Sequence, residues 1–415
     1  MTTETLPKQE NADSSIGVHV KGYIDRVKGG ELGALPAVFG LVILCVVFSV
    51  LRPAFLSAVN FANLFTQGAA VAVIAMGLIF VLLLGEIDLS AGFASGVCAA
   101  VLAVLLTLQG WPWYLAVLAA MITGAVIGMV LGSLVAKLGI PSFVVTLAAF
   151  LAFQGVVLLL VKDGTNISIR DETILAIANK NVPPVAGWAA LVVGVAAYAA
   201  LQFLQARRRV SRGLVATPVA VIAARIVTLA VVAGFAVYVL NLERSRNAAI
   251  VSLKGVPIVV PLIVILLIVW TFVLRRTGYG RHIYAVGGNA EAARRAGINV
   301  DRIRISAFVI CSFMASIGGI IAASRANSVD PNTGGSNVLL FAVGAAVIGG
   351  TSLFGGKGRA LDAVLGGAVV AVIENGMGLM GYSAGVKFVV TGSVLLLAAG
   401  VDALSRKRAA ATGRR

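Results

Sequence analysis

Two carboxylates interrupt a strongly apolar stretch in the first quarter of the chain, and they are the side chains best placed to do chemistry. Glu86 and Asp88 stand in the segment GEIDLSAG, residues 85–92, between two apolar runs. A charge in such a setting is costly unless it faces water, backbone donors or other protein groups. The segment therefore predicts a helix break, in which Asp88 or Ser90 either caps the following helix or lines a polar pathway.

A glycine-rich segment, GGTSLFGGKGRALD at residues 349–362, invites comparison with a phosphate-binding loop. Such a loop needs the pattern G-x-x-x-x-G-K-S/T, whose amides cradle phosphates while the hydroxyl holds magnesium. Here Thr351 occupies the first glycine position, and Gly358 follows Lys357 where serine or threonine is required. The segment predicts a second helix break without an ATPase site, and Thr351 and Ser352 are further candidates for break or pathway positions.

Other catalytic patterns are missing as well. Gly278 and Gly280 begin a G-x-G pattern, but no third glycine follows at the dinucleotide spacing. The two histidines are too few for a histidine metal site, and the three cysteines stand in apolar runs without paired spacing. We therefore expect neither an enzyme nor a bound metal or cofactor in this chain.

One long polar segment, Gly280 to Arg304, lies between strongly apolar runs and predicts a short helix with both ends marked. Asn289 can cap its first turn, and Glu291 and Arg294 have the charges that suit the N-terminus and C-terminus. Gly297 then ends it, because glycine adopts the left-handed conformation without steric cost. So short a helix is not stable alone, so it suits insertion into a partner's cleft. The plain alternative is an ordinary basic loop between two membrane helices.

The elements that must position these residues follow from composition. The 415 residues are 59% hydrophobic and 12% charged, with a mean hydropathy of +1.00. These values are typical of an all-α polytopic membrane protein. A net charge of +16 would by itself suggest nucleic-acid binding, but so few charged residues cannot build a solvated basic face. No nucleic-acid partner is expected.

Twelve apolar runs, two of them short, approach the length that crosses a ~30 Å hydrocarbon core. They predict 10 to 12 transmembrane helices, discontinuous near residues 85–92 and 349–358. The runs are 35–51, 62–84, 91–108, 114–136, 141–161, 185–204, 216–240, 256–274, 305–323, 338–350, 359–379 and 384–401.

The basic residues predict the orientation of these helices. Most of the 33 lysines and arginines fall on the connections that face the cytoplasm if the N-terminus is inside, as the positive-inside rule requires. This places the polar segment 280–304 in the cytoplasm. The predicted organisation is a cytoplasmic tail over 1–34, without a secretory signal peptide, one transmembrane domain over 35–404, and a basic cytoplasmic tail over 405–415.

Three motifs resemble a known family, the membrane permeases of bacterial ABC sugar importers of the ribose/xylose/galactose branch. GEIDLSAG is similar to that family's G-G-I-D-L-S-x-G, and GYGRHIYAVGGNAEAARRAGINVDRIR, from Gly278, resembles its cytoplasmic coupling segment. VIGGTSLFGGKG, from Val347 to Gly358, is similar to a third recurring element. The resemblance covers roughly residues 35–404.

The resemblance implies a multi-pass subunit of the bacterial inner membrane that works with partners. A cytoplasmic ABC ATPase, which binds ATP and Mg, would dock on the helix at residues 289–298. Two permease copies would enclose the path, and an extracytoplasmic sugar-binding protein would deliver the substrate. The residues expected at the docking site are Gly288, Asn289, Glu291, Ala292, Ala293, Arg294, Gly297 and Ile298.

The chain departs from the common pattern at two places. Glu86 stands where many members have glycine, so analogy assigns it no role. Two additional apolar spans within 185–250, together with ENGMGLMG from Glu374 to Gly381, resemble the xylose-type permeases, so xylose is the first expected substrate and ribose or galactose the alternative. The candidates for pathway or break positions are Glu86, Asp88, Ser90, Thr351, Ser352 and Asn375.

Two other classes of transporter remain open on the sequence alone. An ion-coupled secondary transporter would use Glu86 and Asp88 as its ion site and would need no ATPase. A passive channel would let sugar flow without any energy source. The coupling segment favours the ATP-driven class over both.

Overall fold

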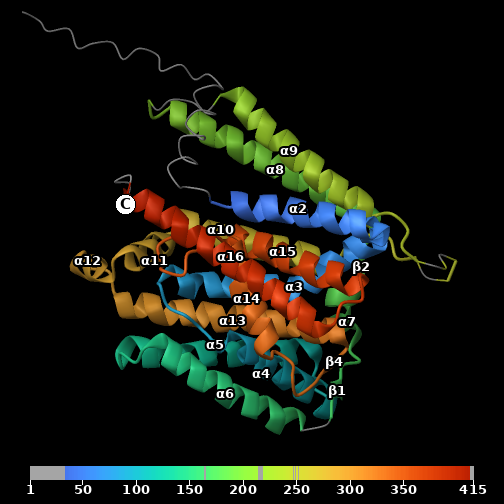
Figure 1. The fold of residues 1–415 in the computed structure, drawn as a ribbon, viewed down its shortest axis with the longest axis horizontal. Helices are drawn as coiled ribbons and strands as arrows, with labels where there is room; N and C mark the ends of the chain where they lie inside the picture. The colour runs from blue at the N-terminus through green and yellow to red at the C-terminus, as the bar shows by residue number, and fades with distance from the viewer. Residues whose placement is uncertain are drawn as a thin grey trace, which may run out of the picture. The chain divides into compact units, whose positions relative to one another are not determined.

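A computed structural model describes residues 33–162, 165–213, 218–245, 247, 249–250 and 252–411 (Figure 1). The predicted tail over 1–34 lies almost wholly outside these residues, and so does the end of the predicted tail over 405–415. The described part of 405–415 continues a helix that begins at Ala384. The described chain is mainly helical, with four two-residue strands.

Most elements are α-helices, and a few short helical turns and strands connect them. In chain order they are α2 Leu35–Leu51, η1 Pro53–Leu56, α3 Ala58–Leu83, α4 Ala91–Ala103, η2 Val104–Leu108, α5 Trp113–Lys137, α6 Ser142–Val161, β1 Ile167–Ser168, α7 Glu172–Asn179, β2 Asn181–Val182, α8 Pro184–Val210, α9 Val219–Leu240, β3 Val256–Pro257, α10 Val259–Arg276, α11 Gly278–Gly288, α12 Ala290–Arg295, α13 Val300–Ala326, β4 Ser328–Val329, α14 Ser336–Ile348, α15 Ala360–Leu379 and α16 Ala384–Ala411.

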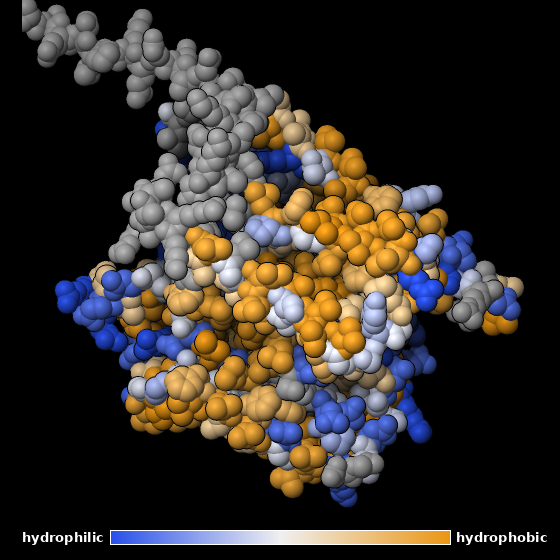
Figure 2. All heavy atoms as spheres, viewed as in Figure 1, coloured by the Kyte–Doolittle hydropathy of each residue, from blue (hydrophilic) through white to orange (hydrophobic). Residues whose placement is uncertain are grey.

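Within the described ranges, nine helices are long and apolar enough to cross a membrane. Three shorter apolar helices accompany them, at Leu35–Leu51, Asn337–Ile348 and Ala384–Leu397. Figure 2 shows apolar residues along α14 and α16, with hydrophilic residues gathered near α12. The predicted all-α polytopic membrane class is confirmed.

Both predicted helix breaks are present. α3 ends at Leu83 and α4 begins at Ala91, while α14 ends at Ile348 and α15 begins at Ala360. Glycines make the turns, since Gly85 has φ +73° and Gly355 has φ +84°, values that other residues rarely adopt. Each break therefore leaves non-helical backbone between two apolar helices, where it must be paired within the protein.

The internal contacts divide the chain into two compact units. The larger comprises Gly33–Asn181 and Pro257–Ala403, and the smaller comprises Val182–Val256 together with residues 404–411 at the chain's end. Whether 35–404 acts as one transmembrane domain stays a prediction, so each unit is described by itself.

In the larger unit, α13 packs along a glycine ridge of α5. A Cβ added at Gly124 would lie 2.6 Å from the Ser312 carbonyl oxygen, and one at Gly132 would lie 2.8 Å from Ile305 Cα. A Cβ added at Gly128, between them, would lie 2.3 Å from the Phe308 carbonyl oxygen of α13. Small residues allow such close approach in lipid, where no hydrophobic force drives helices together. The ridge therefore serves packing inside the bundle.

The smaller unit contains the helical hairpin of α8 and α9. α8 begins with Pro184 in its first turn, where the missing N–H costs nothing, and Arg207, Arg208 and Arg209 lie in its last turn, where the helix dipole favours positive charge. Only Gly187 of α8 is buried. The hairpin is thus held mainly by local interactions and exposes long apolar surfaces.

Candidate functional site

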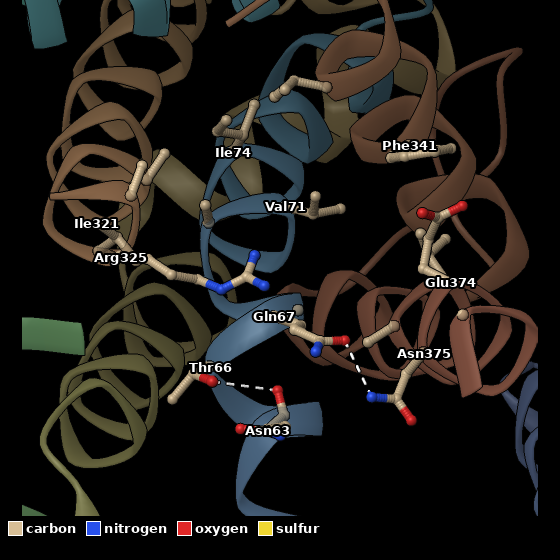
Figure 3. A pocket seen from close by; sticks show the side chains of 18 of the residues that line it. Asn63, Thr66, Gln67, Val71, Ile74, Ile321, Arg325, Phe341, Glu374 and Asn375 are labelled. Atoms are coloured by element: carbon tan, nitrogen blue, oxygen red, sulfur yellow. Dashed lines mark hydrogen bonds between the residues drawn. The ribbon is translucent and has the colours of Figure 1, made fainter. Parts of the chain in front are cut away.

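A cavity of about 790 Å³ lies in the larger unit (Figure 3). Its walls come from α3 between Asn60 and Ile74, Ser95 of α4, the last turns of α13, the second half of α15, and parts of α14 and α16. The volume falls within the roughly 300–1,000 Å³ of small-molecule sites. One small polar substrate fits such a space.

Polar side chains line this cavity from different helices. Arg325 comes from the end of α13, Glu374 and Asn375 come from α15, and Gln67 comes from α3. Asn375 Nδ2 donates to Gln67 Oε1 at 3.2 Å. Lys387 of α16 adds a second positive charge. The lining therefore combines fixed donors and acceptors on otherwise apolar walls.

Two acceptors in the cavity are buried and unpaired. Within the described residues, Glu374 Oε1 and Asn375 Oδ1 have no hydrogen-bond partner. A buried polar atom without a partner is costly. A ligand hydroxyl can accept from Arg325 or Lys387 and, after a side-chain rotation that exposes one of these oxygens, donate to it, because a hydroxyl does both. The set is suited to a neutral polyhydroxyl molecule.

Of the six pathway or break candidates from the sequence, only Asn375 lines this cavity. The sequence reasoning missed Gln67, Arg325, Glu374 and Lys387. A charged or amide side chain within an apolar run is itself a signal of function, and that rule picks out Gln67 and Glu374. Arg325 and Lys387 lie close to the ends of apolar runs, where basic residues are common, so they gave no such signal.

The first break has a structural explanation for its carboxylates. Asp88 is fully buried, and its Oδ1 accepts from the Ser90 N–H at 2.8 Å and from Ser90 Oγ at 2.6 Å. Asp88 therefore organises the turn before α4, but no described side chain forms the expected cap of the helix itself. Ser90 occupies the N-cap position, but its own side chain makes no capping bond.

The second break is likewise closed by its own side chains. Thr351 Oγ1 donates to Asp362 Oδ2 at 3.4 Å, and the Phe354 N–H donates to Ser352 Oγ at 3.2 Å. Arg359 completes a capping box with Asp362, which accepts its backbone N–H at 2.8 Å. Thr351 and Ser352 are buried and do not line the cavity.

The centre of the polar segment 280–304 forms the short capped helix that its residues predict, between α11 and the start of α13. The Asn289 side chain accepts from the Ala292 N–H at 2.9 Å, and Gly297 has φ +84°. Glu291 pairs with Arg294 at 3.8 Å and with Arg295 at 3.2 Å. The helix, α12, lies at one end of the larger unit (Figure 1).

The residues expected to dock a partner differ in accessibility. Six of them are exposed: Gly288, Asn289, Glu291, Ala292, Arg294 and Gly297. Ala293 is 5% exposed and packs in the protein's own core, while Ile298 is half-buried. A partner can therefore reach the capped end and the charged face of α12 but not Ala293. The docking role itself stays a prediction.

Two of the sequence motifs meet at the carbonyl of Leu83, which lies two residues before the first motif. The Gly356 N–H donates to the Leu83 oxygen at 2.8 Å. Gly287, at the end of α11, lies so close that an added Cβ would overlap the same oxygen. Tyr284 Oη donates to the Gly358 carbonyl at 2.6 Å. The coupling segment thus contacts both helix breaks.

An ion pair reinforces this meeting point. Glu86 Oε1 lies 3.3 Å from Arg304 Nε, and their side chains are only 16% and 29% exposed. Arg304 belongs to α13, which follows α12 directly. We call Leu83, Glu86, Tyr284, Gly287, Arg304 and Gly356 the coupling junction. Nearby, burial raises the pKa of Tyr279 to about 12, so this side chain stays neutral.

Comparison with known proteins identifies the family. Residues 60–179 and 172–399 match the family described as "Branched-chain amino acid transport system / permease component". The chain is 33% identical over 405 residues to the xylose transport system permease protein XylH of Escherichia coli K12, covering 97% of this chain and 100% of that protein.

Two further relatives are similar over most of their length. XylH of Haemophilus influenzae is 31% identical over 384 residues, covering 92% of this chain and 99% of that protein. The ribose import permease protein RbsC of Escherichia coli K12 is 30% identical over 367 residues, covering 88% and 92%. No solved structure matches the chain. These matches extend over both the cavity and the coupling junction, so the chain belongs to the branched-chain amino acid transport system permease family and is an integral membrane protein.

Proposed function

We propose that this chain is the permease subunit of an ATP-driven ABC importer and that it forms the path of a monosaccharide, with xylose as the first substrate. One structural observation carries the proposal. Three helices connect the cavity with the coupling junction: α3, α13 and α15. Each lines the cavity near one end, and its other end lies at the coupling junction or next to it. α13 alone, with 27 residues, spans about 40 Å.

Its partners would supply energy and substrate. An ATPase subunit, which binds ATP and Mg, docks on the exposed charged face of α12, and an extracytoplasmic binding protein delivers the sugar to the cavity end. A second copy of this chain completes the path. The excess of basic residues on one set of connections supports an inner-membrane location with both termini in the cytoplasm.

The mechanism follows from rigid helices that join two ends. ATP binding moves the docked ATPase against α12, and the close contact of Gly287 with Leu83 passes the displacement to α3. The Glu86–Arg304 pair passes it to the start of α13. Because packed elements shift between discrete arrangements, a small movement at the junction can open or close the cavity.

The chemistry of the cavity supports a neutral sugar as cargo. Glu374 and Asn375 offer free acceptors, while Arg325 and Lys387 offer donors. A monosaccharide hydroxyl uses both kinds of group, and no single charge dominates the lining. The named relatives that transport xylose and ribose support the same substrate class.

An ion-coupled transporter with Glu86 and Asp88 as its ion site has less support. Glu86 is paired with Arg304, and Asp88 accepts both bonds from Ser90 through Oδ1, while its Oδ2 has no partner in the described chain. The two carboxylates therefore serve different local contacts and do not form one site.

The function is tested by uptake of labelled xylose in source cells that lack this chain. Uptake should fall to background and return with the wild-type protein. A Glu291→Ala/Arg294→Ala double variant should reach the membrane in normal amount and restore no uptake, because it removes the charges of the docking face. Arg170→Ala, which removes an exposed charge elsewhere, is the matched control.

Uptake at the wild-type rate by the double variant would overturn the docking role. Transport by the purified chain alone under an imposed proton or sodium gradient would overturn the ATP-driven class. Competition by unlabelled ribose and galactose ranks the substrate: stronger competition by either than by xylose would replace xylose as the cargo.

A further inference from the structure

The hairpin of α8 and α9 exposes an apolar surface that has no part in the proposed sugar path. α9 has only two buried residues, Ile222 and Leu240, and large apolar side chains such as Val231 and Phe235 are more than 60% exposed. In an integral membrane protein such a surface is expected to face lipid. The hairpin is therefore a place where the chain meets individual lipid molecules.

Arg225 is the one charged residue of α9. It is the seventh residue of the helix, about 9 Å along its axis from Val219. Its side chain is exposed, and in the described part of the chain no carboxylate lies within ion-pair distance of it. An arginine at this depth is costly unless an anion or water meets it. The guanidinium thus needs a partner from outside the described protein.

Arg225 is one of the residues that line a cavity of about 590 Å³ between α8 and α9. Tyr198 of α8 and Thr228 of α9 line the same cavity, so three groups able to donate hydrogen bonds share it. The remaining lining includes Leu229 and Val232, which are apolar. A group of charged oxygens attached to a hydrocarbon chain fits both parts of this lining.

The wider charge pattern favours an anion. The hairpin over 184–240 contains no aspartate or glutamate, whereas Arg207, Arg208 and Arg209 end α8 and Arg212 follows. Each basic residue near an anionic leaflet strengthens the attraction roughly fivefold. The hairpin and the lipid headgroups of such a leaflet are therefore complementary in charge.

We propose that the α8–α9 hairpin binds one anionic phospholipid. Its phosphate contacts the Arg225 guanidinium and the hydroxyls of Tyr198 and Thr228, and an acyl chain lies on the apolar lining beside them. None of these residues lines the 790 Å³ cavity. The proposal therefore stands apart from the proposed sugar path.

Native mass spectrometry of the purified full-length protein tests this site, after equilibration with mixed micelles that contain phosphatidylglycerol or phosphatidylcholine. The wild type should retain phosphatidylglycerol in preference to phosphatidylcholine. Arg225→Gln should lower that retention about tenfold, the loss expected for one charge-assisted contact. Arg225→Lys should retain an intermediate amount, because it keeps the charge but loses the planar fork.

Arg170→Gln is the matched control, since it removes an exposed arginine from the larger unit and should leave retention unchanged. Gel filtration and the thermal midpoint verify that each variant is folded. Equal retention by wild type and Arg225→Gln, or equal affinity for the two lipids, would overturn the proposal. So would occupancy of the hairpin by a second protein chain, detected as a cross-link in the Thr228→Cys variant, or displacement of the lipid by millimolar inorganic phosphate.

Discussion

The polar groups described at the two ends of the larger unit differ in whether they have hydrogen-bond or ion-pair partners. At the coupling junction, Glu86 is paired with Arg304 and the Leu83 carbonyl accepts from Gly356. At the cavity, Glu374 Oε1 and Asn375 Oδ1 remain unpaired within the described chain. Satisfied polar networks rigidify a structure, whereas unsatisfied ones are costly and must have a reason. The contrast separates polar groups that the protein itself satisfies from polar groups at the cavity that have no partner within the described chain.

The contrast predicts that junction substitutions reduce stability and transport together. Gly287→Ala should have the largest effect, because its Cβ would overlap the Leu83 backbone and neither segment can move freely. Overpacking of this kind costs about 1–3 kcal/mol of the free energy of unfolding. We expect a lower thermal midpoint of the purified protein and at least about tenfold slower sugar uptake.

Gly288→Ala is the matched control for that variant. Its added Cβ has open space around it, so the thermal midpoint should stay within experimental error. Equal midpoints for the two variants would mean that the contact of α11 with α3 is not a packed one.

The Glu86–Arg304 pair should show the next largest effect. Glu86→Gln leaves the mostly buried Arg304 without its ion-pair partner, at a cost of roughly 1–3 kcal/mol in the free energy of unfolding. Arg304→Gln should cost a similar amount, and the double variant should cost less than the sum of the two. Additive losses in this double-mutant cycle would contradict a direct interaction.

Substitutions at the cavity should weaken transport without a matching loss of stability. Glu374→Gln and Arg325→Gln remove charges that form no salt bridge within the described chain, and only Lys387 acts electrostatically on Glu374, so the thermal midpoint should fall little. The KM for sugar uptake should rise about tenfold, because each loses one hydrogen bond between a charged group and the substrate. A large loss of stability with an unchanged KM would assign these residues to packing.

The Tyr284 hydroxyl should give the smallest measurable effect at the junction. Tyr284→Phe removes its bond to the Gly358 carbonyl and should cost about 1 kcal/mol of the free energy of unfolding. Tyr382→Phe, at an exposed tyrosine, should cost nothing measurable. A cost at position 382 equal to that at 284 would show that the hydrogen bond adds no stability.

Local features were predictable from the sequence, and contacts between distant segments were not. The Asn289 cap and the Gly297 end of α12 depend on neighbours within a few residues, so propensities predict them. The helix breaks at 85–92 and 349–358 followed from charge and glycine in apolar runs. The ion-pair partner of Glu86 could not be predicted, because Arg304 is more than 200 residues away and nothing in a single sequence indicates that the two are paired.

The cavity illustrates a second limit. Asn375 was a candidate because it falls in the segment ENGMGLMG, which resembles the xylose-type permeases. Arg325 lies at the end of its helix, where basic residues are common and indicate no function. Which of them share one space depends on how α13 and α15 pack, and periodicity alone does not define that packing. The accessible face of α12 was likewise predictable only in part, because Ala293 turned out to be buried.

The meeting of Gly287 and Gly356 at one carbonyl also constrains how such a protein can change over generations. A side chain at position 287 would need a compensating shift in two other segments at once, which single substitutions cannot provide. The polar side chains that line the cavity face no such restriction, although the lining glycines Gly68 and Gly334 do. In a set of related sequences, we therefore expect glycine to persist at 287 whatever sugar is carried, while positions 325, 374 and 387 diversify with the cargo.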